Sequence, residues 1–118
     1  MKLSFEQFAD LTEDIINTIP EKFLINLNGG FSLLPDNKKE DGLYIMGEYI
    51  ENGFMGNYIV IYYGSFCSVL KESNEKKWEE EIKETILHEL QHHIESLAGV
   101  NYLEEQELKE LINMRPKK

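Results

Sequence analysis

Hydrophobic positions recur at two different spacings along the chain, and each spacing predicts a different kind of element. Near the N-terminus, apolar side chains return every three or four residues and would share one face of a helix. These positions are Phe5, Phe8, Leu11, Ile15, Ile16 and Ile19. Ser4 and Gln7 have the spacing of a capping box at its start, and Pro20 would end it. We expect this helix to be scaffold, with no role in chemistry.

The middle of the chain is rich in β-branched and aromatic residues, which favour strands. Four short strands are predicted, at Phe23–Leu27, Phe31–Leu34, Leu43–Ile50 and Asn57–Tyr63. Asn52 and Gly53 form a dipeptide that is typical of hairpin turns. The polar segment 35–42 is expected to be an exposed loop, and segment 64–72 a loop or a short helix.

A second helical pattern begins after Ser73 or Asn74, either of which can act as its N-cap. Its apolar residues fall on the side of the helix opposite to His88, or flank that side. They are Ile82, Ile86, Leu87, Leu90, Ile94 and Leu97. The helix is expected to end near Ala98 and Gly99, because glycine commonly follows a helix C-terminus. A last helix is predicted over residues 101–113.

The polar side of the long helix carries His88-Glu-Leu-Gln-His92, an H-E-x-x-H motif. Four residues make slightly more than one helical turn, so both imidazoles project from one face and can bind one tetrahedral zinc ion. Glu89 lies about a quarter-turn away, where it can reach a water molecule on the metal as a general base. The apolar stripe excludes the two motif histidines, which argues against a purely structural pair. His93 lies further round the helix and is expected to be structural or to support the site.

Composition narrows the classes of function. The length of 118 residues fits a single domain over residues 1–118. The net charge of −10 and the pI of about 4.7 argue against a nucleic-acid partner, because the surface would repel phosphates. The single Cys67 cannot form an internal disulfide, and no apolar run is long enough to span a membrane. We therefore expect a cytoplasmic protein with no membrane partner.

The order of elements, together with the motif, resembles a known family. The similar features are a helix closed by proline, strands containing Gly42-Leu-Tyr44 and Ile59-Val-Ile-Tyr-Tyr63, and then Thr85-Ile-Leu-His-Glu-Leu-Gln-His-His93. Together they resemble the short bacterial zincin-like metallopeptidases, or minimal zincins. The resemblance implies an α+β fold in which the H-E-x-x-H helix packs against a small mixed or antiparallel sheet, with helices at both termini. It also implies zinc on the two motif histidines and the motif glutamate as base.

The third protein ligand is not given by the motif itself. A catalytic zinc ion normally has three protein ligands and one water molecule. In many members of the family that this chain resembles, a glycine soon after the motif is followed by an Asp or Ser ligand. Here the glycine comes about one helical turn later, and the residue three positions after it is Tyr102. Glu95, three residues past His92, is one candidate ligand, and Glu104 or Glu105 from the last helix is another. The remaining alternatives are a ligand that the sequence does not reveal and a site completed by water. Glu95 could instead accept a hydrogen bond from a ligand's ring N–H.

The function predicted from these residues is zinc-dependent hydrolysis of a peptide or protein substrate, which would bind as an extended strand at the sheet edge. The main alternative is a zinc-stabilised binding or regulatory module with little or no turnover. A third possibility is a peptide deformylase, which also uses H-E-x-x-H. That enzyme takes a cysteine ligand from a Glu-Gly-Cys loop, whereas Cys67 lies in Ser-Phe-Cys-Ser. The last is a helix that binds no metal.

Overall fold

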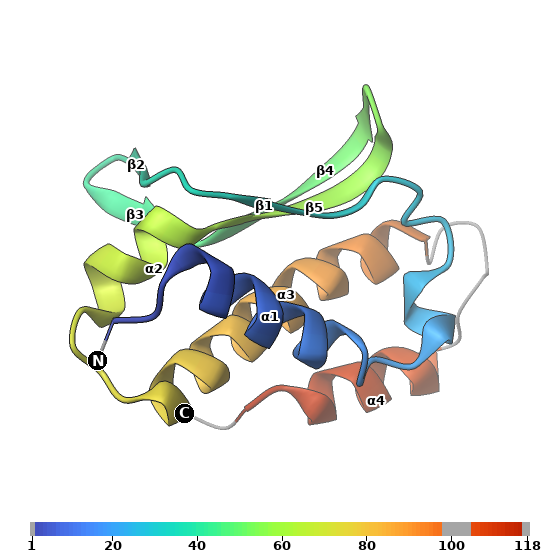
Figure 1. Cartoon of the computed structure of the whole chain (residues 1–118). Coiled ribbons are helices and arrows are strands. Elements are labelled where there is room, and N and C mark those ends of the chain that lie inside the picture. The colour runs from blue at the N-terminus through green and yellow to red at the C-terminus, as the bar shows by residue number, and fades with distance from the viewer. Residues whose placement is uncertain (1, 98–104, 117–118) are drawn as a thin grey trace.

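The computed structural model describes residues 2–97 and 105–116. Within these ranges a three-stranded sheet forms one layer, the helices lie along one of its faces, and no helix covers the other face (Figure 1). The elements are α1 (Phe5–Ile16), the 3-10 helix η1 (Glu21–Leu24), β1 (Gly30–Leu34), β2 (Lys38–Glu40), β3 (Leu43–Ile45), β4 (Gly47–Gly53), β5 (Gly56–Tyr62), α2 (Tyr63–Leu70), α3 (Glu75–Leu97) and α4 (Glu105–Met114). The fold is therefore of the mixed α+β class, as predicted.

Helix α1 begins at the residues predicted from the sequence. The backbone N–H of Gln7 donates to Oγ of Ser4 at 3.1 Å, and the N–H of Ser4 donates to Oε1 of Gln7 at 2.8 Å. Further along the helix, Phe8 is fully buried and its ring contacts Phe66 of α2 and Trp78 of α3. These contacts place α1 in the hydrophobic core.

The sheet has the strand order β1-β5-β4, with the most hydrophobic strand at its centre. β1 pairs with β5 in parallel, from Gly30 opposite Tyr58 to Leu34 opposite Tyr62. β4 pairs with β5 in the antiparallel sense. β4 is therefore an edge strand of this sheet.

The predicted hairpin is present, but its turn lies later than expected. β4 continues through Gly53, and the chain turns at residues 54–55. Asn52 has φ of +55°, and the pairing of the two strands shifts between Ile50 and Gly53. The left-handed backbone of Asn52 therefore lies at an irregularity within the strand pairing and not in the turn of the hairpin.

The predicted strand at Phe23–Leu27 is wrong, because the chain there forms a 3-10 helix followed by a turn. The N–H of Phe23 donates to the carbonyl of Pro20 at 3.0 Å, and the N–H of Leu27 donates to Leu24 at 3.1 Å. Phe23 and Leu27 are both buried. Two buried residues four apart suit helical turns. In a strand, residue 25, midway between Phe23 and Leu27, would share their buried face, but Ile25 is exposed.

The predicted loop over 35–42 is also wrong in part, since β2 pairs with β3 in a small two-stranded sheet. A distant residue holds β2 in place. Oγ of Ser65, fully buried in α2, accepts from the N–H of Lys38 at 2.9 Å and donates to its carbonyl at 3.0 Å. The single strand predicted at 43–50 is divided at Met46 into β3 and β4.

The long helix α3 connects the layers of the molecule. Oδ1 of Asn74 accepts from the N–H of Lys77 at 2.9 Å, which identifies Asn74 as the cap. The helix contacts β4 and β5 as well as α1 and α4. All six apolar positions assigned to its core side are buried, together with Trp78 and His93.

Helix α4 lies against α3. Its Leu111 is fully buried, and Glu110 accepts from Nζ of Lys22 at 2.8 Å. The expected end of α3 at Ala98 and Gly99, and the expected start of the last helix at residues 101–104, lie outside the described residues. Within the described part of the chain, no helix is both long and apolar enough to cross a membrane.

Candidate metal centre

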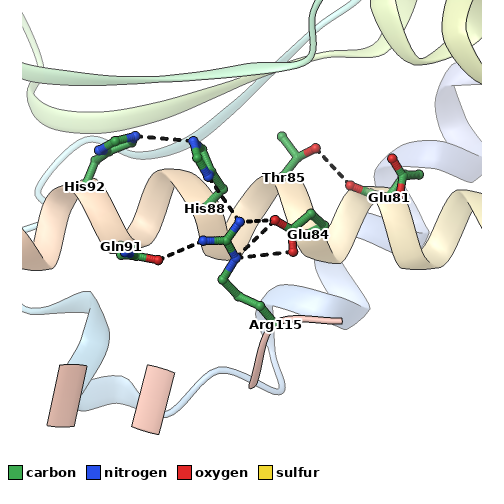
Figure 2. A network of polar contacts seen from close by, with 7 residues as sticks. All are labelled: Glu81, Glu84, Thr85, His88, Gln91, His92 and Arg115. Carbon is green, nitrogen blue, oxygen red and sulfur yellow. Dashed lines mark hydrogen bonds and ion pairs between the residues drawn. The ribbon is translucent and has the colours of Figure 1, made fainter. Parts of the chain in front are cut away.

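The two motif histidines project from the same side of α3 and face each other (Figure 2). Nε2 of His88 lies 3.3 Å from Nε2 of His92, and the planes of the two rings are nearly perpendicular, at 89°. Both side chains are exposed. The sequence-based placement of the pair on one polar face agrees with these positions.

The spacing of the two nitrogens fits a shared tetrahedral metal. Zinc–imidazole bonds of about 2.0–2.1 Å at a tetrahedral angle place two nitrogen ligands about 3.3 Å apart. Burial lowers the pKa of His88, and the neighbouring His92 and Arg115 lower it further. A neutral imidazole is the form that binds metals, so the lowered pKa of His88 favours metal binding. The positions of both His88 and His92 suit a divalent ion.

Glu89 lies beside this pair in a partly buried position. Burial raises the pKa of Glu89 to about 7, although the backbone N–H of Tyr49 donates to its carboxylate and acts in the opposite direction. A carboxyl group with a pKa near neutrality can both accept and release a proton at physiological pH. Its environment therefore suits proton transfer.

A buried hydrogen-bond network holds the strand that contacts Glu89. Nε2 of His93 lies 2.8 Å from the carbonyl of Ile25, so this nitrogen carries the ring hydrogen. Nδ1 of His93 then accepts from the hydroxyl of Tyr49 at 2.9 Å. His93 is fully buried. Its place is structural, in support of β4 and, through the N–H of Tyr49, of Glu89.

A groove of about 230 Å³ runs beside the histidine pair. One side is formed by residues 44–47 and the other by four residues of α3, which are Glu84, Thr85, His88 and Glu89. Strand and helix approach closely at Gly47, where a Cβ would lie 2.8 Å from Cγ2 of Thr85. Glycine at this position therefore sets the separation between β4 and α3.

The peptide groups of β4 point alternately to β5 and to the open edge. The carbonyl of Met46 accepts from the N–H of Tyr62 at 2.9 Å, so Met46 faces β5. Alternation then turns the peptide groups of Gly47 and Tyr49 toward the edge. The contact of the Tyr49 N–H with Glu89 agrees with this direction.

The structure does not bring a third ligand to the pair within the described residues. Oε1 of Glu95 lies 3.8 Å from Nδ1 of His92, on the opposite side of the ring from the nitrogen that faces His88. Across residues 2–97 and 105–116 no group of three His, Cys, Asp or Glu side chains is arranged to hold a metal ion. Glu104 lies outside the described residues, and so does the side chain of Glu105.

One residue that contacts the candidate site was missed by sequence reasoning. Arg115 follows α4, and its guanidinium contacts three residues of α3 (Figure 2). Its Nε donates to both carboxylate oxygens of Glu84 at 3.0 and 3.2 Å, and its Nη1 donates to Gln91 at 2.8 Å. Its Nη2 contacts Glu84 as well and lies 3.2 Å from Nδ1 of His88. A single arginine near the end of a chain has no local pattern that could have predicted these contacts.

Comparison with known proteins bears on this site. Residues 34–113 match a family model described as zincin-like metallopeptidase. The chain is also similar to a solved structure of a conserved hypothetical protein from Thermus thermophilus, with 39% sequence identity and a TM-score of 0.73. That similarity covers 83% of this chain and 100% of the other. No curated protein matches the sequence.

Proposed function

The chain belongs to the zincin-like metallopeptidase family, and from this premise we propose that it hydrolyses peptide bonds with a zinc ion held by His88 and His92. One observation carries the proposal. Two imidazole nitrogens at tetrahedral-ligand spacing lie beside a carboxyl group, Glu89, whose pKa is raised to about 7. Metal ligands and a proton acceptor are the two parts that hydrolysis by this class of site requires.

The metal-binding atoms would be Nε2 of His88 and Nε2 of His92, completed by a third ligand. A divalent ion bound there would supply Lewis acidity, which polarises a carbonyl and acidifies water. The third ligand is proposed among Glu95, Glu104 and Glu105, as the sequence suggested. The position of Glu95 beside Nδ1 of His92 favours a supporting role for it, so we propose Glu104 or Glu105 before Glu95 as the ligand.

Glu89 is proposed as the general base. Its carboxylate would take a proton from the attacking water and return it to the nitrogen of the departing amine. The N–H of Tyr49 keeps the carboxylate oriented, and burial keeps its proton affinity high. The same side chain can then act in both proton transfers.

The proposed substrate is an extended segment of peptide bound along β4. The backbone N–H and C=O of Gly47 and the C=O of Tyr49 point to the open edge of the sheet, next to the groove that contains His88 and Glu89, whereas the N–H of Tyr49 already donates to Glu89. An added strand would satisfy the free backbone groups of an edge, and this is a common mode of peptide recognition. With a net charge of −10, the chain favours neutral or basic segments over nucleic acid.

Replacement of Glu89 by Gln tests this proposal. Protein purified without a histidine tag should contain zinc, and Glu89→Gln should retain it while peptide cleavage falls by at least about 100-fold. Glu80→Gln, the same change at an exposed position of α3, is the matched control and should cleave as the parent does. Zinc in the parent without cleavage would favour a zinc-stabilised binding module. Cleavage that survives Glu89→Gln would contradict the assigned base.

A further inference from the structure

We propose that Arg115 is a positioning residue that competes with the metal ion for His88. The inference rests on the proposed function, because it takes His88 and His92 as metal ligands. It concerns a different question, which is how the chain controls whether His88 is available to the metal.

The guanidinium of Arg115 is held against one stripe of α3. Its partners Glu84, His88 and Gln91 follow one another at spacings of four and three residues, so they share one face of the helix. The backbone of Arg115 is itself anchored, since its N–H donates to the carbonyl of Ile112 at 3.1 Å. The side chains of Arg115 and Glu84 are only 25% and 14% exposed, so water screens this contact less than an ordinary surface ion pair.

The contact with His88 decides which ring nitrogen can bind a metal. Arginine has five N–H donors and no acceptor, so Nδ1 of His88 must accept from Nη2 of Arg115. A neutral ring has one hydrogen, which then lies on Nε2. That nitrogen faces Nε2 of His92 at 3.3 Å and donates to it. In this arrangement His88 has no lone pair directed at a metal.

Metal binding requires the opposite arrangement of the same ring. A histidine that binds through Nε2 carries its hydrogen on Nδ1 and donates it to a neighbouring acceptor. This cannot coexist with a hydrogen bond from Arg115 to Nδ1. The ring keeps one hydrogen throughout, so binding exchanges the positions of the hydrogen and the lone pair. Arg115 has to leave His88 for this to happen.

Glu84 is the acceptor that would replace Arg115. It precedes His88 by four residues and contacts the same nitrogen, Nη2 of Arg115, that contacts His88. Once Arg115 leaves His88, the carboxylate can accept from Nδ1 and hold the ring in its metal-binding form. His92 differs, because its Nδ1 already lies toward Glu95. Arg115 and Glu84 therefore act on one of the two ligands, in opposite directions.

Zinc affinity, measured by competition with a chromophoric chelator on tag-free and metal-free protein, tests the inference. Arg115→Met removes the competing donor and should tighten zinc binding about tenfold, the effect of one charged hydrogen bond of about 1.4 kcal/mol. Adding Glu84→Gln to that variant removes the acceptor and should weaken binding again, by about tenfold. Lys22→Met is the matched control, because it removes one positive charge and another contact of α4, the ion pair with Glu110, and should leave the affinity unchanged.

The outcomes are distinguishable. If Arg115 only fastens α4 to α3, Arg115→Met would leave zinc affinity unchanged or weaken it, and adding Glu84→Gln would then have no further effect. Either result overturns the inference while leaving the proposed function intact. If the parent chain binds no zinc in the same assay, the proposed function fails as well.

Discussion

At the scale of single residues, the proposed proton transfer depends on the environment of Glu89. An exposed glutamate ionises near pH 4.5, whereas burial beside β4 raises the pKa of Glu89 to about 7. The N–H of Tyr49 donates to its carboxylate but does not offset the cost of burial. The folded chain therefore holds this proton more tightly than the unfolded chain does.

This difference predicts a pH dependence of stability in the metal-free protein. Between pH 4.5 and about pH 7 the folded state binds the Glu89 proton and the unfolded state releases it, so rising pH must lower the free energy of unfolding. Glu89→Gln removes the titrating group. In the presence of a chelator, urea unfolding should show the variant gaining stability relative to the parent as pH rises from 5 to 8. A gap that stays constant over this range would contradict the buried environment of Glu89, and Glu80→Gln controls for the loss of one carboxylate.

The sequence predicted the placement of single side chains where the contacts are local. His88 and His92 are separated by one helical turn, so their facing positions follow from the spacing. The residues that contact Glu89 and His88 from other elements are distant in sequence. Tyr49, which donates to Glu89, lies on another element, and Arg115 reaches His88 from beyond α4. No pattern in the sequence specifies which distant side chain meets which.

At the scale of elements, the position of the site depends on how closely α3 approaches β4. Gly47 permits this approach, since a Cβ there would lie 2.8 Å from Cγ2 of Thr85 and 3.1 Å from the carbonyl oxygen of Val60. Gly47 and Thr85, the two residues in this close contact, both line the groove beside His88 and Glu89.

Gly47→Ala should consequently destabilise the fold by about 1–3 kcal/mol, as overpacking usually does. Without the clash, alanine in a strand would be the more stable residue. Urea unfolding provides the measurement. The double variant with Thr85→Ser, which lacks the clashing methyl group, should recover part of the loss, and Thr85→Ser alone is the control. A Gly47→Ala protein as stable as the parent would show that β4 and α3 are not in close contact.

Elements differed from prediction where non-local contacts override local preference. The capping box of Ser4 and Gln7 is closed by its own neighbours, and it was predicted from the sequence. Phe23 is a residue type that favours strands, but here it lies in a 3-10 helix and its side chain is buried. β2 was missed because its support, Ser65, lies in α2. Propensity is a weak guide when packing decides.

At the scale of the whole molecule, a small core supports one exposed site. The described helices lie along one face of the sheet (Figure 1). The long helix α3 presents its apolar side to the core and its two motif histidines to solvent. The mixed α+β class and the family could be predicted from the order of elements and the motif. The identity of a third metal ligand could not, because the motif places only two histidines and leaves any further ligand to residues outside it.

Anomalous diffraction from zinc-loaded crystals, recorded at the zinc absorption edge, shows whether His88 and His92 together bind one divalent metal ion. We expect a single strong peak about 2.0–2.1 Å from Nε2 of both histidines, with a third protein ligand beside it. Crystals grown in saturating zinc that show no anomalous peak between the two rings would contradict it.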